Sequence, residues 1–182
     1  MPEITLLSQE TIDKIAAGEV VERPSSVVKE LVENAIDAKA TAVTVEIKEG
    51  GISFIRITDN GCGIERAQVP LAFLRHSTSK IKSVEDLMSI TSLGFRGEAL
   101  SSIAAVSQVE LITKTYEELT GTRYVIEGSK EIENEEIGAP EGTTFIVRNL
   151  FYNVPARRKF LKTAQTEAGY ISDLMERMAL SH

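Results

Sequence analysis

The feature that most constrains the fold is a change of hydrophobic period near residue 40. Residues 24–38 have apolar side chains at helical spacing, and Pro24 is favourable in a first turn, so this segment predicts an amphipathic helix. Its apolar stripe consists of Val28, Leu31, Val32 and Ala35. Residues 43–57 instead alternate apolar with polar side chains on both sides of Gly50 and Gly51. This pattern predicts a β-hairpin directly after the helix.

The remaining segments extend the same pattern. Ser8 is a candidate cap for a helix over Gln9–Ala17 that ends before Gly18, and a further helix is expected from Glu98 to Ala105. Strands are expected at 109–113, 122–126 and 143–147, followed by two helices within 155–180. Helix, hairpin, helix and closely spaced strands predict an α+β fold, a two-layer α/β sandwich with a mostly antiparallel sheet and helices on one face. There is no regular βαβ alternation and no GxxxxGK[ST] loop, which argues against a doubly wound nucleotide fold.

Charge and cysteine content narrow the class of protein. The formal charge of −7 opposes general adhesion to nucleic acid or anionic lipid, so a polyanion would need a local basic patch. The best candidate is the set Arg157, Arg158, Lys159 and Lys162, although such a run is often only a solvated helix face. The single cysteine, Cys62, cannot form an intramolecular disulfide, which favours a reducing, cytoplasmic location. No signal peptide and no run of about 20 apolar residues is present, so no membrane association is expected.

The helix over 24–38 carries the first candidate site. Glu30, Asn34 and Asp37 stand at i, i+4 and i+7, so they share one stripe, which we expect to lie opposite the apolar one. Solvated polar residues explain this spacing equally well. Alternatively, a carboxylate one turn from a carboxamide can serve a water molecule and a metal together, with Glu30 orienting a nucleophile and the Asn34 oxygen binding magnesium.

The segment DNGCGI follows the strand pattern IRITD directly. Aspartate, asparagine and glycine are typical of a turn at a strand end. A second glycine allows another interpretation, in which Gly61 and Gly63 let the backbone lie against a flat ligand and Asp59 accepts a hydrogen bond from an exocyclic amine such as that of adenine. Cys62 then serves only as a small filler.

The segment LGFRGEALSSI places two glycines just before a helix pattern. Amides freed by Gly94 and Gly97 could bind an anion, and Arg96 adds a charged donor for phosphate oxygens. An ordinary helix end followed by a new start explains the glycines as well. The upstream segment RHSTSKI offers further phosphate donors on weaker grounds, while its His76 is better explained as structural. These donors are Thr78, Ser79 and Lys80.

Together these segments resemble a known family. KELVENAIDAKA, DNGCGI, LGFRGEAL and GTTFIVRNLFYNVPARRKFL are similar to the four nucleotide-binding motifs of the GHKL ATPase superfamily, which includes gyrase-type topoisomerases, certain heat-shock chaperones and sensor histidine kinases. The forms GFRGEAL and NVPARRKFL, with the opening IDKIAAGEVVERP, resemble the MutL mismatch-repair proteins, and the match covers the whole chain. The resemblance implies a Bergerat-type sandwich that binds ATP with magnesium.

The resemblance also implies residue roles. Glu30 would be the general base that activates water, and Asn34 the magnesium ligand, with Asp37 on the same stripe. Asp59 would recognise the adenine amino group, assisted by Gly63 and the Thr143 hydroxyl. Gly61 and Ile64 belong to the same motif. The lid around the phosphates would consist of Gly94, Phe95, Arg96, Gly97, Glu98, Ala99 and Leu100.

For the whole protein, the resemblance implies a slow ATP-driven switch. ATP would order the lid and the N-terminal arm, two ATPase domains would form a homodimer, and hydrolysis would release them while mismatch recognition passes to excision proteins. Residues 1–182 are expected to be the nucleotide-binding domain alone, without the second α/β domain that supplies a lysine and much of the DNA groove, and without the C-terminal dimerisation region. DNA contact is then expected only through the full-length dimer. The alternatives are a non-catalytic nucleotide-sensing scaffold or another GHKL ATPase such as a gyrase-type subunit.

Overall fold

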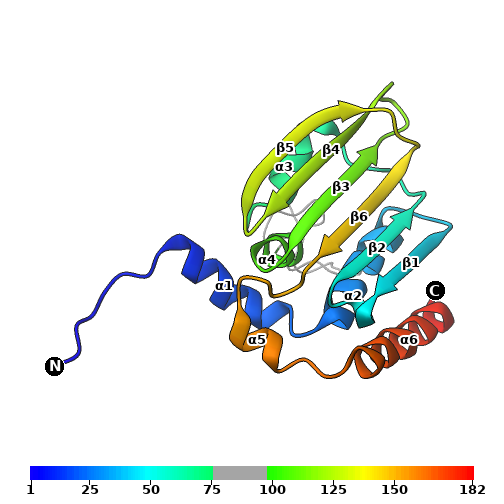
Figure 1. Ribbon diagram of the computed structural model, residues 1–182. Helices are drawn as coiled ribbons and strands as arrows, with labels where there is room; N and C mark the ends of the chain where they lie inside the picture. Colours follow the sequence, from blue (N-terminus) through cyan, green and yellow to red (C-terminus); the bar gives the residue numbers. More distant parts are fainter. Residues whose placement is uncertain (76–97) are drawn as a thin grey trace, which may run out of the picture.

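The computed structural model describes residues 1–75 and 98–182. These residues form a six-stranded antiparallel sheet in the order β1-β2-β6-β3-β4-β5. Figure 1 shows the sheet with helices packed on one side of it. The strands are β1 (Val43–Lys48), β2 (Phe54–Asp59), β3 (Gln108–Lys114), β4 (Gly121–Glu127), β5 (Lys130–Ile137) and β6 (Gly142–Arg148). The predicted α+β sandwich is therefore confirmed.

One face of the sheet is buried and the other is open. In β3, Val109, Leu111 and Thr113 are almost fully buried, while the residues between them are half-buried. This alternation is what a strand shows when a helix layer covers only one of its faces. The hairpin and the three later strands lie where the sequence predicts them. β5 was not expected, because its exposed sequence KEIENEEI lacks an apolar alternation.

Two N-terminal helices begin where the sequence predicts. α1 (Gln9–Val20) starts at Ser8, whose hydroxyl accepts a hydrogen bond from the Thr11 amide at 3.2 Å, and α2 (Pro24–Asp37) has proline at its first position. The expected stop before Gly18 is wrong, because Gly18 lies inside α1 and the Val21 amide still bonds to the Ala17 carbonyl. α2 packs on β1 and β2, and its apolar residues join the core.

The other helices complete the layer. α4 (Ala99–Ala105) packs against β3, β4 and α1, and α6 (Ala164–Ser181) packs against α2 and the short helix η1 (Glu49–Gly51). The core that these elements enclose includes the fully buried Phe151, Leu31, Ile55, Ile103 and Leu111. The short helices are η2 (Arg66–Gln68), α3 (Val69–Ala72) and α5 (Pro155–Lys159). No helix within the described ranges is both long and apolar enough to cross a bilayer.

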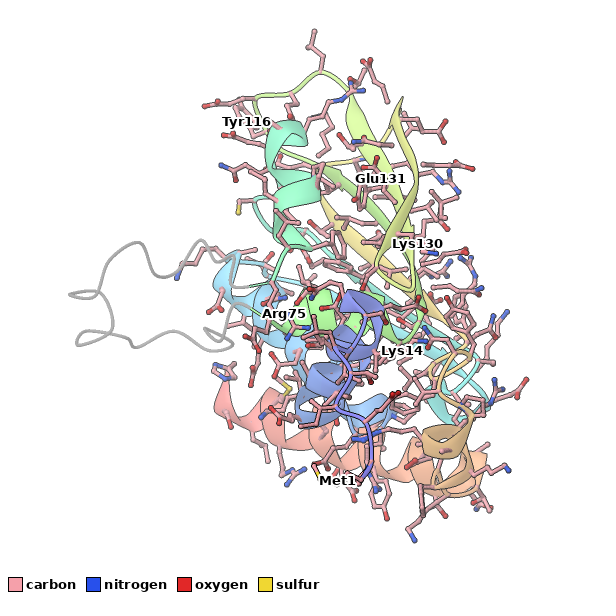
Figure 2. All side chains as sticks on the ribbon, turned by 90° about the vertical axis from the view of Figure 1, so that its left-hand side faces the viewer. Met1, Lys14, Arg75, Tyr116, Lys130 and Glu131 are labelled. Carbon is pink, nitrogen blue, oxygen red and sulfur yellow. The ribbon has the colours of Figure 1, made fainter. Side chains whose placement is uncertain are left out.

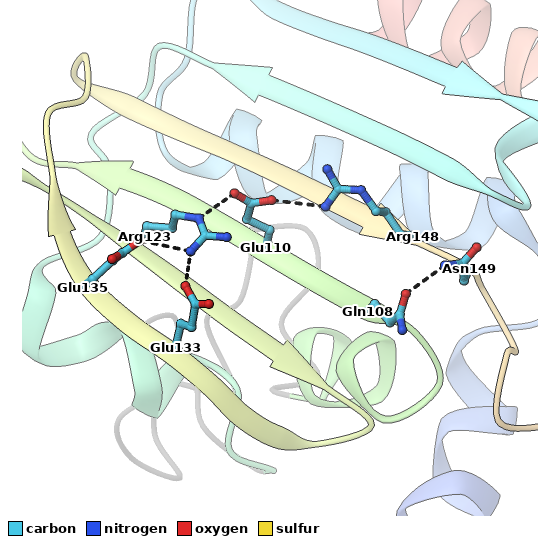
Figure 3. Close-up of polar contacts among 7 residues, drawn as sticks. All are labelled: Gln108, Glu110, Arg123, Glu133, Glu135, Arg148 and Asn149. Atoms are coloured by element: carbon cyan, nitrogen blue, oxygen red, sulfur yellow. Dashed lines mark hydrogen bonds and ion pairs between the residues drawn. The ribbon is translucent and has the colours of Figure 1, made fainter.

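The open face of the sheet carries a network of ion pairs (Figure 3). Arg123 on β4 pairs with Glu110 on β3 at 2.8 Å and with Glu133 and Glu135 on β5, the latter at 3.0 Å. Glu110 also pairs with Arg148 on β6 at 3.1 Å. Because these groups lie at the surface, each pair stabilises the fold by about 1 kcal/mol or less. The network gives the uncovered face a polar surface.

Candidate functional site

The segment after β2 forms a turn that is fixed to the end of α2. The Asp59 carboxylate accepts a hydrogen bond from the Gly61 amide at 2.7 Å, and the Cys62 amide donates to the Ala38 carbonyl at 3.0 Å. On the other side of the turn, the side-chain oxygen of Asn60 accepts a hydrogen bond from the Thr41 amide at 2.8 Å. The helix that carries Glu30 and Asn34 and the turn that begins at Asp59 are therefore held together by hydrogen bonds.

Asp59 and Thr143 lie side by side on the helix-covered face. They are paired residues of neighbouring strands β2 and β6, and paired side chains point to the same face. Burial raises the pKa of the Asp59 carboxyl above its usual value, although hydrogen bonds from the Gly61 and Thr143 backbones partly offset the increase. Thr143 is 7% exposed. A half-buried carboxylate and a buried hydroxyl that belong to elements far apart in the sequence thus form one polar group.

Thr113 on β3 completes this group, and sequence reasoning did not identify it. Its hydroxyl lies 2.9 Å from the Thr143 hydroxyl, accepts a hydrogen bond from the Ile64 amide at 2.9 Å and lies 3.1 Å from the Gly142 carbonyl. The only available signal was a threonine at an inward position of a strand whose other inward residues, Val109 and Leu111, are apolar.

Packing within the protein explains Gly63. Its φ is +72°, and a Cβ atom there would lie 2.2 Å from the Lys114 carbonyl oxygen. This distance is far too short for a contact, so the backbone approach to the end of β3 requires glycine. Gly61 is likewise packed against its neighbours, since a Cβ atom added there would lie 2.8 Å from the Ala38 Cβ. The interpretation that these glycines are needed to accommodate a flat ligand is therefore not required.

The stripe on α2 lies on the side of the helix away from its apolar residues and is nevertheless partly buried. Glu30, Asn34 and Asp37 are all half-buried, whereas Lys29 is exposed. At 100° per residue, Glu30, Asn34 and Asp37 lie about 160°, 120° and 180° around the helix from the fully buried Val28, which agrees with the expected opposed stripe. Their half-burial shows that this side of the helix is partly covered as well. Partial burial lets these side chains contact a ligand bound against the helix layer, and it weakens the interpretation of plain solvated polar residues.

The donor set on α2 fits a magnesium ion that is shared with a phosphate ligand. Among residues 1–75 and 98–182, no group of three or more histidine, cysteine, aspartate or glutamate side chains could hold a metal by itself. Magnesium in proteins is commonly held by one or two side-chain oxygens together with water and substrate phosphates. The Asn34 amide oxygen provides one such donor.

Several predicted phosphate ligands lie outside the described residues. These are Thr78, Ser79, Lys80, Gly94, Phe95, Arg96 and Gly97, and the same holds for His76. Glu98, Ala99 and Leu100 are described: Glu98 precedes α4, its carbonyl accepts the Ser102 amide at 2.9 Å, and all three residues are half-buried. Arg75 lies beside α1 (Figure 2) and pairs with Asp13 at 2.8 Å.

The predicted basic patch is divided by the fold. Arg158, Lys159 and Lys162 are exposed, but Arg157 is half-buried. Its guanidinium donates a 2.5 Å hydrogen bond to the Gly18 carbonyl of α1 and lies 5.8 Å from the centre of the Phe151 ring. Arg157 therefore fixes α1 to the segment after β6, and only the other three cations remain as a surface patch.

The chain belongs to the family described as "Histidine kinase-, DNA gyrase B-, and HSP90-like ATPase", which matches residues 22–145. This range includes α2, the turn after Asp59 and Thr143. Within this broad class, the more particular resemblance to MutL is confirmed by two curated relatives. The chain is 82% identical over its whole length to "DNA mismatch repair protein MutL" of Agathobacter rectalis and 57% identical to that of Caldanaerobacter subterraneus subsp. tengcongensis. It spans 28% and 31% of the length of these relatives.

Solved structures agree with this assignment. The "Aquifex aeolicus MutL ATPase domain complexed with ADP" is 38% identical, with a TM-score of 0.69, and the match covers 88% of this chain and 56% of that one. The "N terminal domain of a DNA repair protein" is 30% identical with a TM-score of 0.74, over 90% of this chain and 47% of that one. The alternatives of a gyrase-type subunit or a non-catalytic scaffold are not favoured.

Proposed function

We propose that this chain binds ATP on the helix-covered face of the sheet, between α2 and the ends of β2 and β6. The observation that carries the proposal is the pairing of the half-buried Asp59 with the buried Thr143 beside the turn over 59–64. Asp59 would accept a hydrogen bond from the adenine amino group, with Thr143, Gly61, Gly63 and Ile64 around the base. The similarity to an ATPase domain complexed with ADP supports this choice of ligand.

In this proposal the α2 stripe provides the reaction chemistry. The Glu30 carboxylate acts as the general base that takes a proton from the attacking water, and Asn34 is a magnesium ligand, with Asp37 one turn further along the same stripe. Bound magnesium would neutralise charge that develops on the phosphate oxygens. The segment Gly94–Leu100, with Thr78, Ser79 and Lys80, would donate hydrogen bonds to the phosphates.

For the longer protein that the curated relatives indicate, we propose an ATPase that acts in DNA mismatch repair. Residues 1–182 would be its nucleotide-binding domain. ATP would order the segment around the phosphates and favour a homodimer through the N-terminal region, so that mismatch recognition is coupled to excision proteins. DNA contact would arise in the full-length dimer, and the location would be cytoplasmic.

Substitutions at the α2 stripe test these roles. Glu30→Ala should leave ATP affinity largely intact and abolish phosphate release in the full-length protein, since it removes only the base. Asn34→Ala should abolish the difference between ATP affinities measured by calorimetry with and without magnesium. Lys29→Ala, an exposed change directly before Glu30 on the same helix, is the control. Loss of ATP binding in Glu30→Ala, or an unchanged magnesium dependence in Asn34→Ala, would remove the corresponding assignment.

A further inference from the structure

Thr113 is a buried hydroxyl with three polar neighbours. It is 1% exposed, so water cannot replace a missing partner. The Ile64 amide donates to it at 2.9 Å, the Gly142 carbonyl lies at 3.1 Å, and the Thr143 hydroxyl lies at 2.9 Å. These contacts join the turn after Asp59 to strands β3 and β6.

The capacities of these groups fix the direction of each bond. A threonine hydroxyl has one hydrogen to donate and two lone pairs that accept. The Gly142 carbonyl can only accept, so the Thr113 hydrogen must point to it, and the Ile64 amide occupies one lone pair of Thr113. The contact with Thr143 is then satisfied only if Thr143 donates to the remaining lone pair. This is the one assignment that satisfies all three contacts.

The consequence is that the hydrogen of Thr143 is already used within the protein. Its oxygen keeps lone pairs, so toward a ligand Thr143 acts as a hydrogen-bond acceptor. The neighbouring Asp59 carboxylate is also an acceptor. The site thus presents two acceptors side by side, which suits an amino group with two N–H donors and is unfavourable for a carbonyl oxygen.

We infer that Thr113 is a specificity-determining positioning residue, which holds the Thr143 hydroxyl as an acceptor and thereby selects a purine with a 6-amino group over one with a 6-oxo group. The inference rests on the proposed function, since it assumes that the base lies against Asp59 and Thr143. Removing the Thr113 oxygen frees the Thr143 hydroxyl to rotate and donate to a 6-oxo group. Discrimination then weakens even though Thr113 does not contact the base.

The test compares ADP with inosine diphosphate, which differs from it by a 6-oxo group in place of the amino group and the accompanying proton on N1. Dissociation constants for both are measured by calorimetry in the wild type, Thr113→Val and Thr113→Ser. Thr113→Val should lower the ratio of the dissociation constant of inosine diphosphate to that of ADP by about threefold to tenfold, which corresponds to the free energy of one hydrogen bond. Thr113→Ser retains the hydroxyl and should keep the preference. Thr144→Val is the matched control, because the Thr144 hydroxyl lies on the open face and contacts Thr58 at 3.3 Å.

A structural role alone would give a different result. If Thr113→Val weakens ADP and inosine diphosphate by the same factor, Thr113 supports only the fold of the turn, and the inference is wrong. Should Thr113→Val not fold, Thr143→Val and Thr143→Ser provide the test. The preference for ADP over inosine diphosphate should fall in Thr143→Val and persist in Thr143→Ser. The same preference in both variants would refute the inference.

The proposed function can fail separately. If the wild type does not bind ADP, or if Asp59→Ala leaves ADP affinity unchanged, the site is misplaced and the inference falls with it. If Asp59→Ala abolishes ADP binding but Thr113→Val keeps the wild-type preference, only the role of Thr113 is refuted.

Discussion

Gly63→Ala is the most informative single change in the turn after Asp59. Alanine at φ +72° costs about 1–2 kcal/mol in backbone strain. In addition, its Cβ would lie 2.2 Å from the Lys114 carbonyl oxygen and 2.6 Å from the carbonyl carbon. These are backbone atoms that cannot rotate away, so the turn or the end of β3 must move, at a further cost of about 1–3 kcal/mol. The expected loss of stability is about 2–5 kcal/mol in total.

Urea unfolding and thermal melting measure this loss. For a chain of this size, each kcal/mol lowers the melting temperature by about 2–4 °C. Gly138→Ala is the control, since a Cβ there meets no atom within 4 Å, and it should be neutral or stabilising by up to about 1 kcal/mol. If Gly63→Ala melts like Gly138→Ala but binds ADP more weakly, the glycine serves the ligand, and the packing explanation is wrong.

Three further changes test the core, the attachment of α1 and the half-buried carboxylate of Asp59. Leu111→Ala leaves a cavity at a fully buried position on β3 and should lower the free energy of unfolding, measured in urea, by about 2–5 kcal/mol. A decrease below about 1 kcal/mol would contradict the described core. Arg157→Ala removes the hydrogen bond to the Gly18 carbonyl and should speed amide hydrogen exchange in α1 but not in β3. If the α1 amides exchange at the same rate in Arg157→Ala as in the wild type, this contact does not fix α1. Because burial raises the pKa of Asp59, the wild type should lose stability relative to Asp59→Asn as the pH rises above the ordinary value of 3.8 through the folded pKa. Asp59→Asn should therefore be the more stable protein at pH 7 and show no advantage below pH 3.8, and a constant difference would contradict the burial argument.

Hydrophobic periodicity predicted the parts of the fold that bury one regular face. α2 and the hairpin after it follow directly from the patterns over 24–38 and 43–57, because each has a helix or strand period and a matching start or turn residue. β5 was missed because an edge strand that pairs only with β4 and buries little needs no apolar alternation. Gly18 did not end α1, since helix packing and the bond from Arg157 outweigh the low helix propensity of one glycine.

The sequence predicted only part of the candidate site. Asp59, Gly63 and Thr143 follow from the motifs, but the pairing of Asp59 with Thr143 depends on the register between β2 and β6. The hydroxyl of Thr113 joins them only through contacts between residues 29 to 49 positions apart, which no local pattern encodes. The half-burial of Glu30 also could not be predicted, because it depends on how α2 packs in the folded chain.

The most direct test of the central claim is calorimetric titration of the wild type, Asp59→Ala and Glu30→Ala with ADP. The account predicts saturable one-to-one binding in the wild type, loss of binding in Asp59→Ala, and near wild-type affinity in Glu30→Ala. Binding that is equally strong in Asp59→Ala, or absent from the folded wild type, would contradict the proposed nucleotide site.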